Sequence, residues 1–142
     1  VGNSVSEELF FRGYLFKSIE RKADWKAAVF FSSLLFGLAH IIGSTSIIYA
    51  VMIFLGTASL GALLAVITYK HGTIWPSVFV HMVMNSKERL VGFDKSSSIF
   101  VFNFVNTPME TQLIICWGIV SIISAIITLF YLQKLKKAEI HS

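Results

Sequence analysis

Long apolar stretches without charge, separated by short polar ones, dominate the chain. The clearest stretch, Ile47 to Tyr69, contains no charged residue and exceeds the roughly 20 residues that a helix needs to cross a bilayer core. Glu110 to Leu132 forms a second apolar stretch, uncharged after Glu110. Trp25 to Ile42 is apolar from Ala27 onward, at a length near the lower limit of ~17 residues. We predict helices over all three.

Two further segments mix apolar residues with a few polar ones. Ser4 to about Glu20 predicts one helix, and a second begins near Lys70 and continues to about Leu90, with Pro76 in its first turn, where no amide donor is needed. A polar, irregular stretch from Gly92 to Pro108 follows. The whole pattern predicts an all-α fold: a polytopic transmembrane helix bundle with about five helical segments.

Small residues recur at helical spacing within the stretch from Ile47 to Tyr69. They are Gly56, Ala58, Gly61, Ala62 and Ala65. Such residues let neighbouring helices approach closely, so we predict that this helix lies inside the bundle.

Composition supports a membrane protein. Hydrophobic residues make up 55% of the chain and charged ones 14%, whereas a soluble domain usually carries about 25% charged residues. Cys116 is the one cysteine, which excludes an internal disulfide and a cysteine-rich metal site. The net charge is +4, but the basic residues lie at segment ends and are not interleaved with aromatic ones. That placement argues against nucleic acid as a partner.

The basic residues also predict an orientation. If the five segments alternate across the membrane, eight of the twelve basic residues fall on one side: Lys17, Arg21, Lys22, Lys26, Lys70, Lys134, Lys136 and Lys137. Because cytoplasmic loops carry the excess of Lys and Arg, this side and the C-terminus are predicted to be cytoplasmic.

Several ionisable residues interrupt the apolar helices, although each costs at least ~2.5 to 3.5 kcal/mol at the bilayer centre. They are Glu7, Glu8 and Arg12 in the first segment, His40 near the end of the second, and His81, with the polar Asn85, in the fourth. Spacings of four place Glu8 with Arg12, Phe36 with His40, and His81 with Asn85 on shared helix faces. Three helices can therefore direct polar groups into one cavity.

The set contains a possible base, two imidazoles able to orient water or a metal, and an amide donor for an oxyanion. Structural interpretations stay open beside this one. Glu8 and Arg12 suit a bridge within one helix, and the whole cluster can serve only to lock helices together. The chain has no H-E-x-x-H, G-x-S-x-G, P-loop or dinucleotide-binding motif.

Three motifs in order resemble the CPBP family, also called Abi or CAAX-protease-like, which includes the type II CAAX prenyl endopeptidases. The E-E-x-x-x-R motif begins at Glu7, the F-x-x-x-H motif is Phe36 to His40, and the H-x-x-x-N motif is His81 to Asn85. The resemblance extends from Ser6 to about Asn85. It implies a helical membrane bundle that hydrolyses peptide bonds near the bilayer, as a CAAX-type endopeptidase.

The resemblance also implies roles for the motif residues. Glu7 would be the general base, with His40 helping to activate the water, while Glu8 and Arg12 brace the site. His81 and Asn85 would stabilise the oxyanion. In a second version, a metalloprotease, Glu7, His40 and His81 hold Zn²⁺, the His₂Glu set of soluble metalloproteases. The residue types are the same in both mechanisms, so the sequence does not distinguish the metal-free mechanism from the zinc-dependent one.

We expect a single membrane domain over residues 1–142, with a CPBP-like core at 4–90 and a C-terminal transmembrane helix at 110–132. Because family members usually have further helices before the first motif, the chain is predicted to be the C-terminal part of a longer protein. The expected location is a bacterial plasma membrane, and the expected partners are a peptide or protein substrate and the lipid bilayer. The oligomeric state stays open.

Two other function classes fit the same residues. One is a non-catalytic membrane scaffold or bacteriocin-immunity module. The other is a small transporter subunit in which intramembrane Glu and His relay protons.

The predicted depths of the two histidines differ. At 1.5 Å per residue, His40 lies ~21 Å from Lys26, past the membrane midplane. His81 follows His71 by only ten residues and would lie nearer the cytoplasmic side. A shared site therefore requires a tilted or recessed segment.

Overall fold

Helices form nearly all of the chain that the structure describes. The computed structural model describes residues 2–44, 46–92, 100–101 and 107–140. The helical elements are α1 (Gly2–Glu8), η1 (Leu9–Phe16), α2 (Lys17–Lys22), α3 (Trp25–His40), α4 (Ile47–His71), α5 (Trp75–Leu90) and α6 (Met109–Ile140). Two strands of two residues each, β1 (Val91–Gly92) and β2 (Phe100–Val101), pair in parallel. The predicted all-α class is confirmed.

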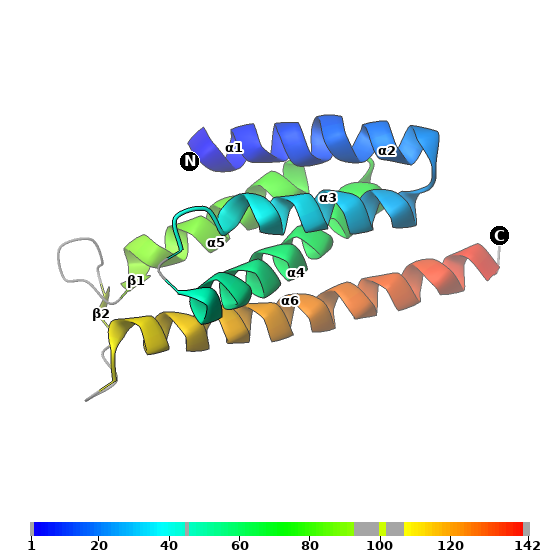
Figure 1. The fold of residues 1–142 in the computed structure, drawn as a ribbon. Coiled ribbons are helices and arrows are strands. Elements are labelled where there is room, and N and C mark those ends of the chain that lie inside the picture. Colours follow the sequence, from blue (N-terminus) through cyan, green and yellow to red (C-terminus); the bar gives the residue numbers. More distant parts are fainter. Residues whose placement is uncertain (1, 45, 93–99, 102–106, 141–142) are drawn as a thin grey trace.

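The first three elements form one continuous rod along the bundle (Figure 1). The helix predicted from Ser4 to about Glu20 is confirmed, but its middle part, η1, winds as a π-helix, which the sequence pattern did not predict. The rod ends after Lys22. Asp24 then begins α3, because its side chain accepts a hydrogen bond from the Ala27 amide at 2.6 Å and so satisfies a free donor of the first turn.

The central helix is α4, which packs against α3, α5, α6 and η1. Over its most apolar window 56% of the residues are buried, against 11% for α6. The predicted interior position of α4 is therefore confirmed. Its small residues serve this packing: a Cβ added at Gly56 would lie 2.6 Å from the Trp117 ring of α6, and one at Gly61 would lie 3.2 Å from the Phe36 ring of α3.

Among the described residues, two helices, α4 and α6, are long and apolar enough to cross a membrane. The third predicted apolar helix, α3, has 16 residues, just below the usual lower limit for spanning. The outer face of α6 exposes a row of large apolar side chains, among them Ile115, Ile119, Ile122 and Ile126. In water such a face would be costly, whereas lipid tails solvate it.

The basic segment ends gather at one end of the bundle. The ring of Trp25, at the start of α3, stacks on Tyr69 near the end of α4, with centroids 4.7 Å apart. Beside them, Lys70 Nζ lies 4.6 Å from the centre of the Tyr131 ring in α6. Figure 1 shows the α2 to α3 turn and the C-terminus at this same end. The predicted grouping is confirmed in space, and its cytoplasmic location stays a prediction.

The predicted irregular stretch from Gly92 to Pro108 lies mostly outside the described residues. The division into a core at 4–90 and a separate helix at 110–132 also stays a prediction. In the structure the corresponding helix, α6, packs along α4 (Figure 1).

Candidate active site

A buried ion pair lies at the centre of the site. Glu8 and Arg12 are both fully buried, and Arg12 Nη1 donates to Glu8 Oε1 at 2.8 Å. Arg12 Nη2 donates to the Gly61 carbonyl of α4 at 3.0 Å. The guanidinium also lies over the Phe36 ring, 4.4 Å from its centroid, an arrangement that stabilises a desolvated cation. Arg12 therefore connects the rod formed by α1, η1 and α2 to α3 and α4.

His81 joins this pair from α5. It is buried, and its Nδ1 lies 2.8 Å from Glu8 Oε1, the oxygen that also accepts from Arg12. Because a carboxylate paired with a guanidinium is an acceptor, Nδ1 of His81 is the donor. Its other nitrogen, Nε2, lies on the side of Glu7, 3.8 Å from Glu7 Oε2. The sequence grouped Glu8 with Arg12 but did not predict that Glu8 also orients His81.

His40 is oriented in the same way by a backbone group. Its Nδ1 lies 2.7 Å from the Phe36 carbonyl, one turn earlier in α3. A carbonyl can only accept, so Nδ1 donates. The other ring nitrogen, Nε2, points away from the Phe36 carbonyl. The Phe36 ring lies against His40, with centroids 4.4 Å apart, and meets His81 edge to face at 5.7 Å. One phenylalanine therefore separates and positions both imidazoles.

Glu7 is where the two imidazoles converge. Its Oε2 lies 3.6 Å from His40 Nε2 and 3.8 Å from His81 Nε2. Both separations exceed a direct hydrogen bond, and Oε2 has no hydrogen-bond partner among the described residues. Three atoms able to accept a proton thus surround one point. A group that donates protons, such as water, fits there, and a cation is the electrostatic alternative.

Exposure divides the set into two parts. The side chains of Glu7 and His40 are 30% and 31% exposed, whereas those of Glu8 and Arg12 are 0% exposed. The outer pair is therefore partly exposed at the bundle surface, although the Glu7 Oε2 atom itself is buried. The inner pair can act only through the residues that it holds, in agreement with the bracing role that the resemblance implies.

Asn85 lies one turn beyond His81 on α5. Its Nδ2 donates to Ser4 Oγ of α1 at 2.9 Å, and Ser4 is buried. Sequence reasoning missed Ser4. Its position three residues before Glu7, on the same helix face, is the signal that could have revealed it. The geometry thus gathers every predicted site residue around the first rod, with Asn85 at the edge.

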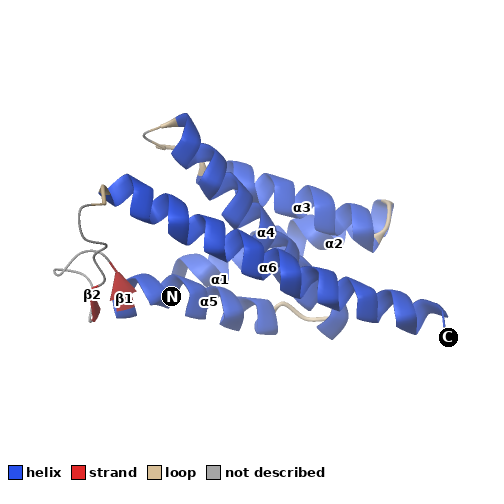
Figure 2. Ribbon diagram, turned by 90° about the horizontal axis from the view of Figure 1, so that it is seen from below, coloured by secondary structure: helices blue, strands red, loops and turns tan. Residues whose placement is uncertain are grey.

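The connection between α4 and α5 explains how His40 and His81 can share a site although their sequence positions predict different depths. It is the recessed segment that a shared site requires. Gly72 ends α4 in the left-handed conformation, with φ of 67°, which favours glycine. Figure 2 shows the connection running along the bundle rather than across its end. Three residues, 72–74, can carry the chain about 10 Å. His81 therefore begins deeper than its spacing from His71 predicts, and it reaches the level of His40.

The donor atoms for a metal are of the right kind but are not close enough together. Zn²⁺ binds His nitrogen and carboxylate oxygen. Each imidazole donates its Nδ1 hydrogen to an oxygen acceptor, an arrangement that usually supports a metal-bound histidine. Tetrahedral Zn²⁺ at about 2.0 to 2.1 Å from each ligand needs ligand atoms about 3.3 to 3.4 Å apart. In the described part of the chain, no group of three or more His, Cys, Asp or Glu side chains could hold a metal ion.

The family model for Type II CAAX prenyl endopeptidase Rce1-like proteins matches residues 1–86. The chain belongs to this family. Every predicted site residue, from Glu7 to Asn85, falls within the match. Searches of curated proteins and of solved structures gave no match. At the family level the protein is a CAAX-type intramembrane protease that acts on a peptide at the membrane, and its apolar helices agree with an integral membrane protein.

Proposed function

We propose that this protein is an intramembrane endopeptidase in which Glu7 activates water against a peptide bond. The observation that carries the proposal concerns Glu7 Oε2, which has no hydrogen-bond partner among the residues that the structure describes. His40 Nε2 and His81 Nε2 converge on this oxygen. Both separations, 3.6 and 3.8 Å, exceed a direct hydrogen bond, so we propose that a water contacts these atoms together. A general base must lie within reach of the proton that it removes, directly or through one water.

In the first step, Glu7 takes a proton from a water that also contacts His40. The water oxygen bonds to the carbonyl carbon of the substrate, and the electron pair of the C=O double bond moves to its oxygen. His40 orients the water, because its Nδ1 is fixed by the Phe36 carbonyl and its Nε2 faces Glu7. Holding the reactants in this geometry supplies much of the rate.

In the second step, the new oxyanion needs donors. The family resemblance assigns this role to His81 and Asn85. Glu8 holds the His81 ring in place through Nδ1. Asn85 has one amide hydrogen on Ser4 and a second for the oxyanion. One such donor can contribute ~2.7 to 4 kcal/mol.

Collapse of the intermediate re-forms the C=O bond and breaks the C–N bond. The proton that Glu7 took from water goes to the leaving nitrogen, which departs as an amine. The other product is a carboxylate, and its released proton returns to solvent.

The test is cleavage of a fluorogenic membrane peptide by the purified protein in lipid nanodiscs. Glu7→Gln keeps the size of the side chain and removes the base, and His40→Ala removes the water-orienting ring. We expect both to lower kcat by at least about 10²-fold. Glu20→Gln removes a carboxylate from a partly exposed pair with Lys17 and should cleave as the wild type does. Circular dichroism verifies folding of each variant.

Equal cleavage by Glu7→Gln and wild type would favour the scaffold interpretation. In that case the buried Glu8, Arg12 and His81 network serves only to hold α1, α4 and α5 together. A rate that follows an imposed proton gradient would instead favour the transporter interpretation.

Binding of Zn²⁺ by Glu7, His40 and His81 stays a prediction, and so does the metalloprotease assignment. Metal analysis of the purified protein tests it, together with inactivation by a chelator and recovery on adding Zn²⁺. Loss of zinc in His40→Ala would identify these residues as ligands.

We further propose that the end of the bundle with Trp25, Lys70 and Lys136 faces the cytoplasm, because it carries the excess of basic residues. The bacterial plasma membrane stays the predicted location. Labelling of Lys136→Cys by a membrane-impermeant maleimide in oriented vesicles, in a Cys116→Ala background, tests the orientation.

A further inference from the structure

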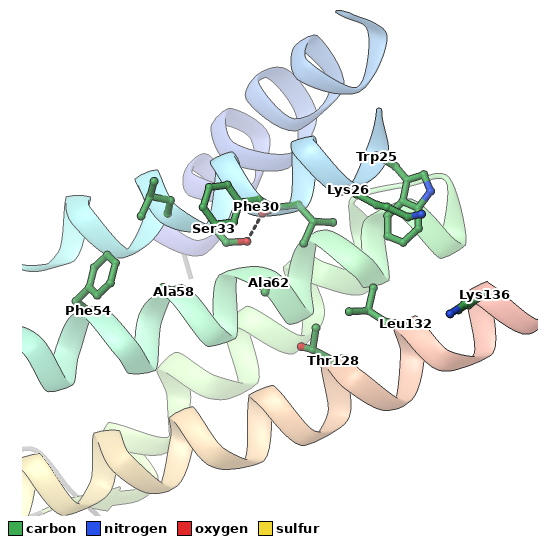
Figure 3. Close-up of a pocket in the computed structure, with 12 residues that line it drawn as sticks. Trp25, Lys26, Phe30, Ser33, Phe54, Ala58, Ala62, Thr128, Leu132 and Lys136 are labelled. Carbon is green, nitrogen blue, oxygen red and sulfur yellow. Dashed lines mark hydrogen bonds between the residues drawn. The ribbon is translucent and has the colours of Figure 1, made fainter. Parts of the chain in front are cut away.

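A long pocket lies outside the candidate active site, between α3, α4 and α6 (Figure 3). Its volume is about 810 Å³, within the range of small-molecule sites. Small residues of α4, Ala58 and Ala62, form its floor, while Phe30 of α3 and Leu132 of α6 stand on its two sides. None of its lining residues belongs to the site around Glu7.

The walls of this pocket offer a ligand almost no hydrogen bonds. The two hydroxyl groups that line it are bonded within their own helices: Ser33 Oγ donates to the Val29 carbonyl at 2.5 Å, and Thr128 Oγ1 donates to the Ser124 carbonyl at 2.7 Å. The remaining wall, apart from one end, is apolar. A ligand must therefore be apolar over most of its length.

One end of the pocket is cationic. Lys26 and Lys136 line it there, close to Trp25 (Figure 3). Both lysines are exposed, and neither pairs with a carboxylate among the side chains that the structure describes. This is the end where Trp25 stacks on Tyr69. Aromatic side chains gather at headgroup depth, so the two ammonium groups lie where lipid phosphates are.

The length of the pocket corresponds to one leaflet. From Lys26 to Leu34 along α3 is eight residues, or ~12 Å, and from Lys136 to Thr128 along α6 is the same. Half of the ~30 Å hydrocarbon core is about 15 Å. The pocket thus extends from headgroup depth toward the middle of the bilayer, as an acyl chain does.

We propose that this pocket binds an anionic glycerophospholipid, with one acyl chain along α4 and the phosphate between Lys26 and Lys136. Two features favour this occupant over a second protein helix. The lysines at one end complement a phosphate, and the walls are apolar with their hydroxyl groups already hydrogen-bonded. Basic pockets between membrane helices on the cytoplasmic side bind such headgroups. The proposal does not depend on the proposed proteolysis.

The test is native mass spectrometry of the purified protein, titrated with dioleoyl phosphatidylglycerol or dioleoyl phosphatidylcholine. We expect the anionic lipid to bind about tenfold or more tightly than the zwitterionic one. Lys26→Gln with Lys136→Gln should abolish this preference. Lys22→Gln with Lys137→Gln removes the same charge outside the pocket and should retain it.

A second set of variants tests the acyl chain without changing charge. Ala62→Phe fills the floor of the pocket and should lower binding of the anionic lipid about tenfold, and Ala58→Leu should do the same if Ala62→Phe folds poorly. Equal binding of both lipids by the wild type, retained preference in the Lys26 and Lys136 variant, or displacement of lipid by a second copy of the chain would overturn the proposal.

Discussion

His81 Nδ1 lies 2.8 Å from Glu8 Oε1, and this contact joins residues 73 positions apart in the chain. The same oxygen accepts from Arg12, so two buried groups, the Arg12 guanidinium and the His81 imidazole, share one carboxylate oxygen. Glu8 adds no reactive atom to the cavity. It fixes which nitrogen of His81 is left for chemistry, and the stability of the bundle and the geometry of the site therefore depend on the same contact.

Replacing Arg12 with Met should destabilise the protein strongly. The change leaves Glu8 buried without its cation, a loss that costs about 3 to 5 kcal/mol for buried pairs. It also leaves the Gly61 carbonyl without its donor. Thermal unfolding in detergent measures the effect. As a control, Lys17→Met breaks a partly exposed pair with Glu20 and should cost about 0 to 1 kcal/mol. Similar losses in both variants would contradict the argument.

Gly61→Ala should lower activity by moving Arg12. An added Cβ would lie 3.3 Å from Arg12 Nη2 and 3.2 Å from the Phe36 ring, and both neighbours are packed in the core. The matched change Gly13→Ala meets nothing nearer than 3.9 Å, the Glu8 carbonyl oxygen, and alanine is the better helix former. Cleavage assays should show loss of activity in Gly61→Ala and not in Gly13→Ala. Wild-type activity in Gly61→Ala would show that the position of Arg12 does not determine the cleavage rate.

The sequence predicted the helices well because their signals are local. Uncharged length marked α4 and α6, and small residues at helical spacing marked α4 as central. The π-helical winding of η1 carries no such signal, since its residues read as an ordinary amphipathic helix. The structure shows the π-helical winding at Leu9–Phe16, directly after Glu7 and Glu8 of the site, and π-helical turns are often found at functional sites.

The site was predicted as a set of residues but not as a geometry. Spacing of four showed which residues share a helix face, and it cannot show contacts between helices. Glu8 with His81, Arg12 with Gly61, and Asn85 with Ser4 are all contacts of this second kind. The histidine depths are predicted to differ because the sequence pattern begins the fourth helix near Lys70, whereas α5 begins at Trp75, after a connection that runs along the bundle (Figure 2).

Ser4 should act on catalysis through Asn85. Ser4→Ala removes the hydroxyl that accepts from Asn85 Nδ2, so the amide loses the contact that fixes its orientation. We expect a lower kcat with KM nearly unchanged, and a loss of about 1 kcal/mol in stability. Steady-state cleavage kinetics measure both parameters, and Ser4→Thr, which keeps the hydroxyl, should restore most of kcat.

A double-mutant cycle distinguishes this positioning role from a general effect on packing. If Ser4 acts through Asn85, the Asn85→Ala variant should lose little more activity when Ser4→Ala is added. Fully additive losses in kcat would show that the two residues act separately.

Gly56→Ala should weaken the attachment of α6 while leaving the site intact. An added Cβ would lie 2.6 Å from the Trp117 ring and 3.1 Å from its carbonyl oxygen, so backbone must move, at a cost of about 1 to 3 kcal/mol for overpacking. Gly118→Ala is the matched control in the same interface. Its Cβ would meet Met52 Cε at 3.2 Å, the end of a flexible side chain that can move aside.

Disulfide formation between α4 and α6 measures this attachment. Ser59 Oγ and Ser121 Oγ lie 3.2 Å apart, so Ser59→Cys and Ser121→Cys should oxidise to a crosslink in a Cys116→Ala background. We expect efficient crosslinking in the Gly118→Ala variant and slower crosslinking in Gly56→Ala. Peptide cleavage should be lowered in neither variant. The reason is that Glu7 and its partners contact α4 on the side of Gly61 and not on the side of Trp117. Loss of cleavage together with the crosslink would mean that α6 supports the site, and the two faces of α4 would then have to be treated as coupled.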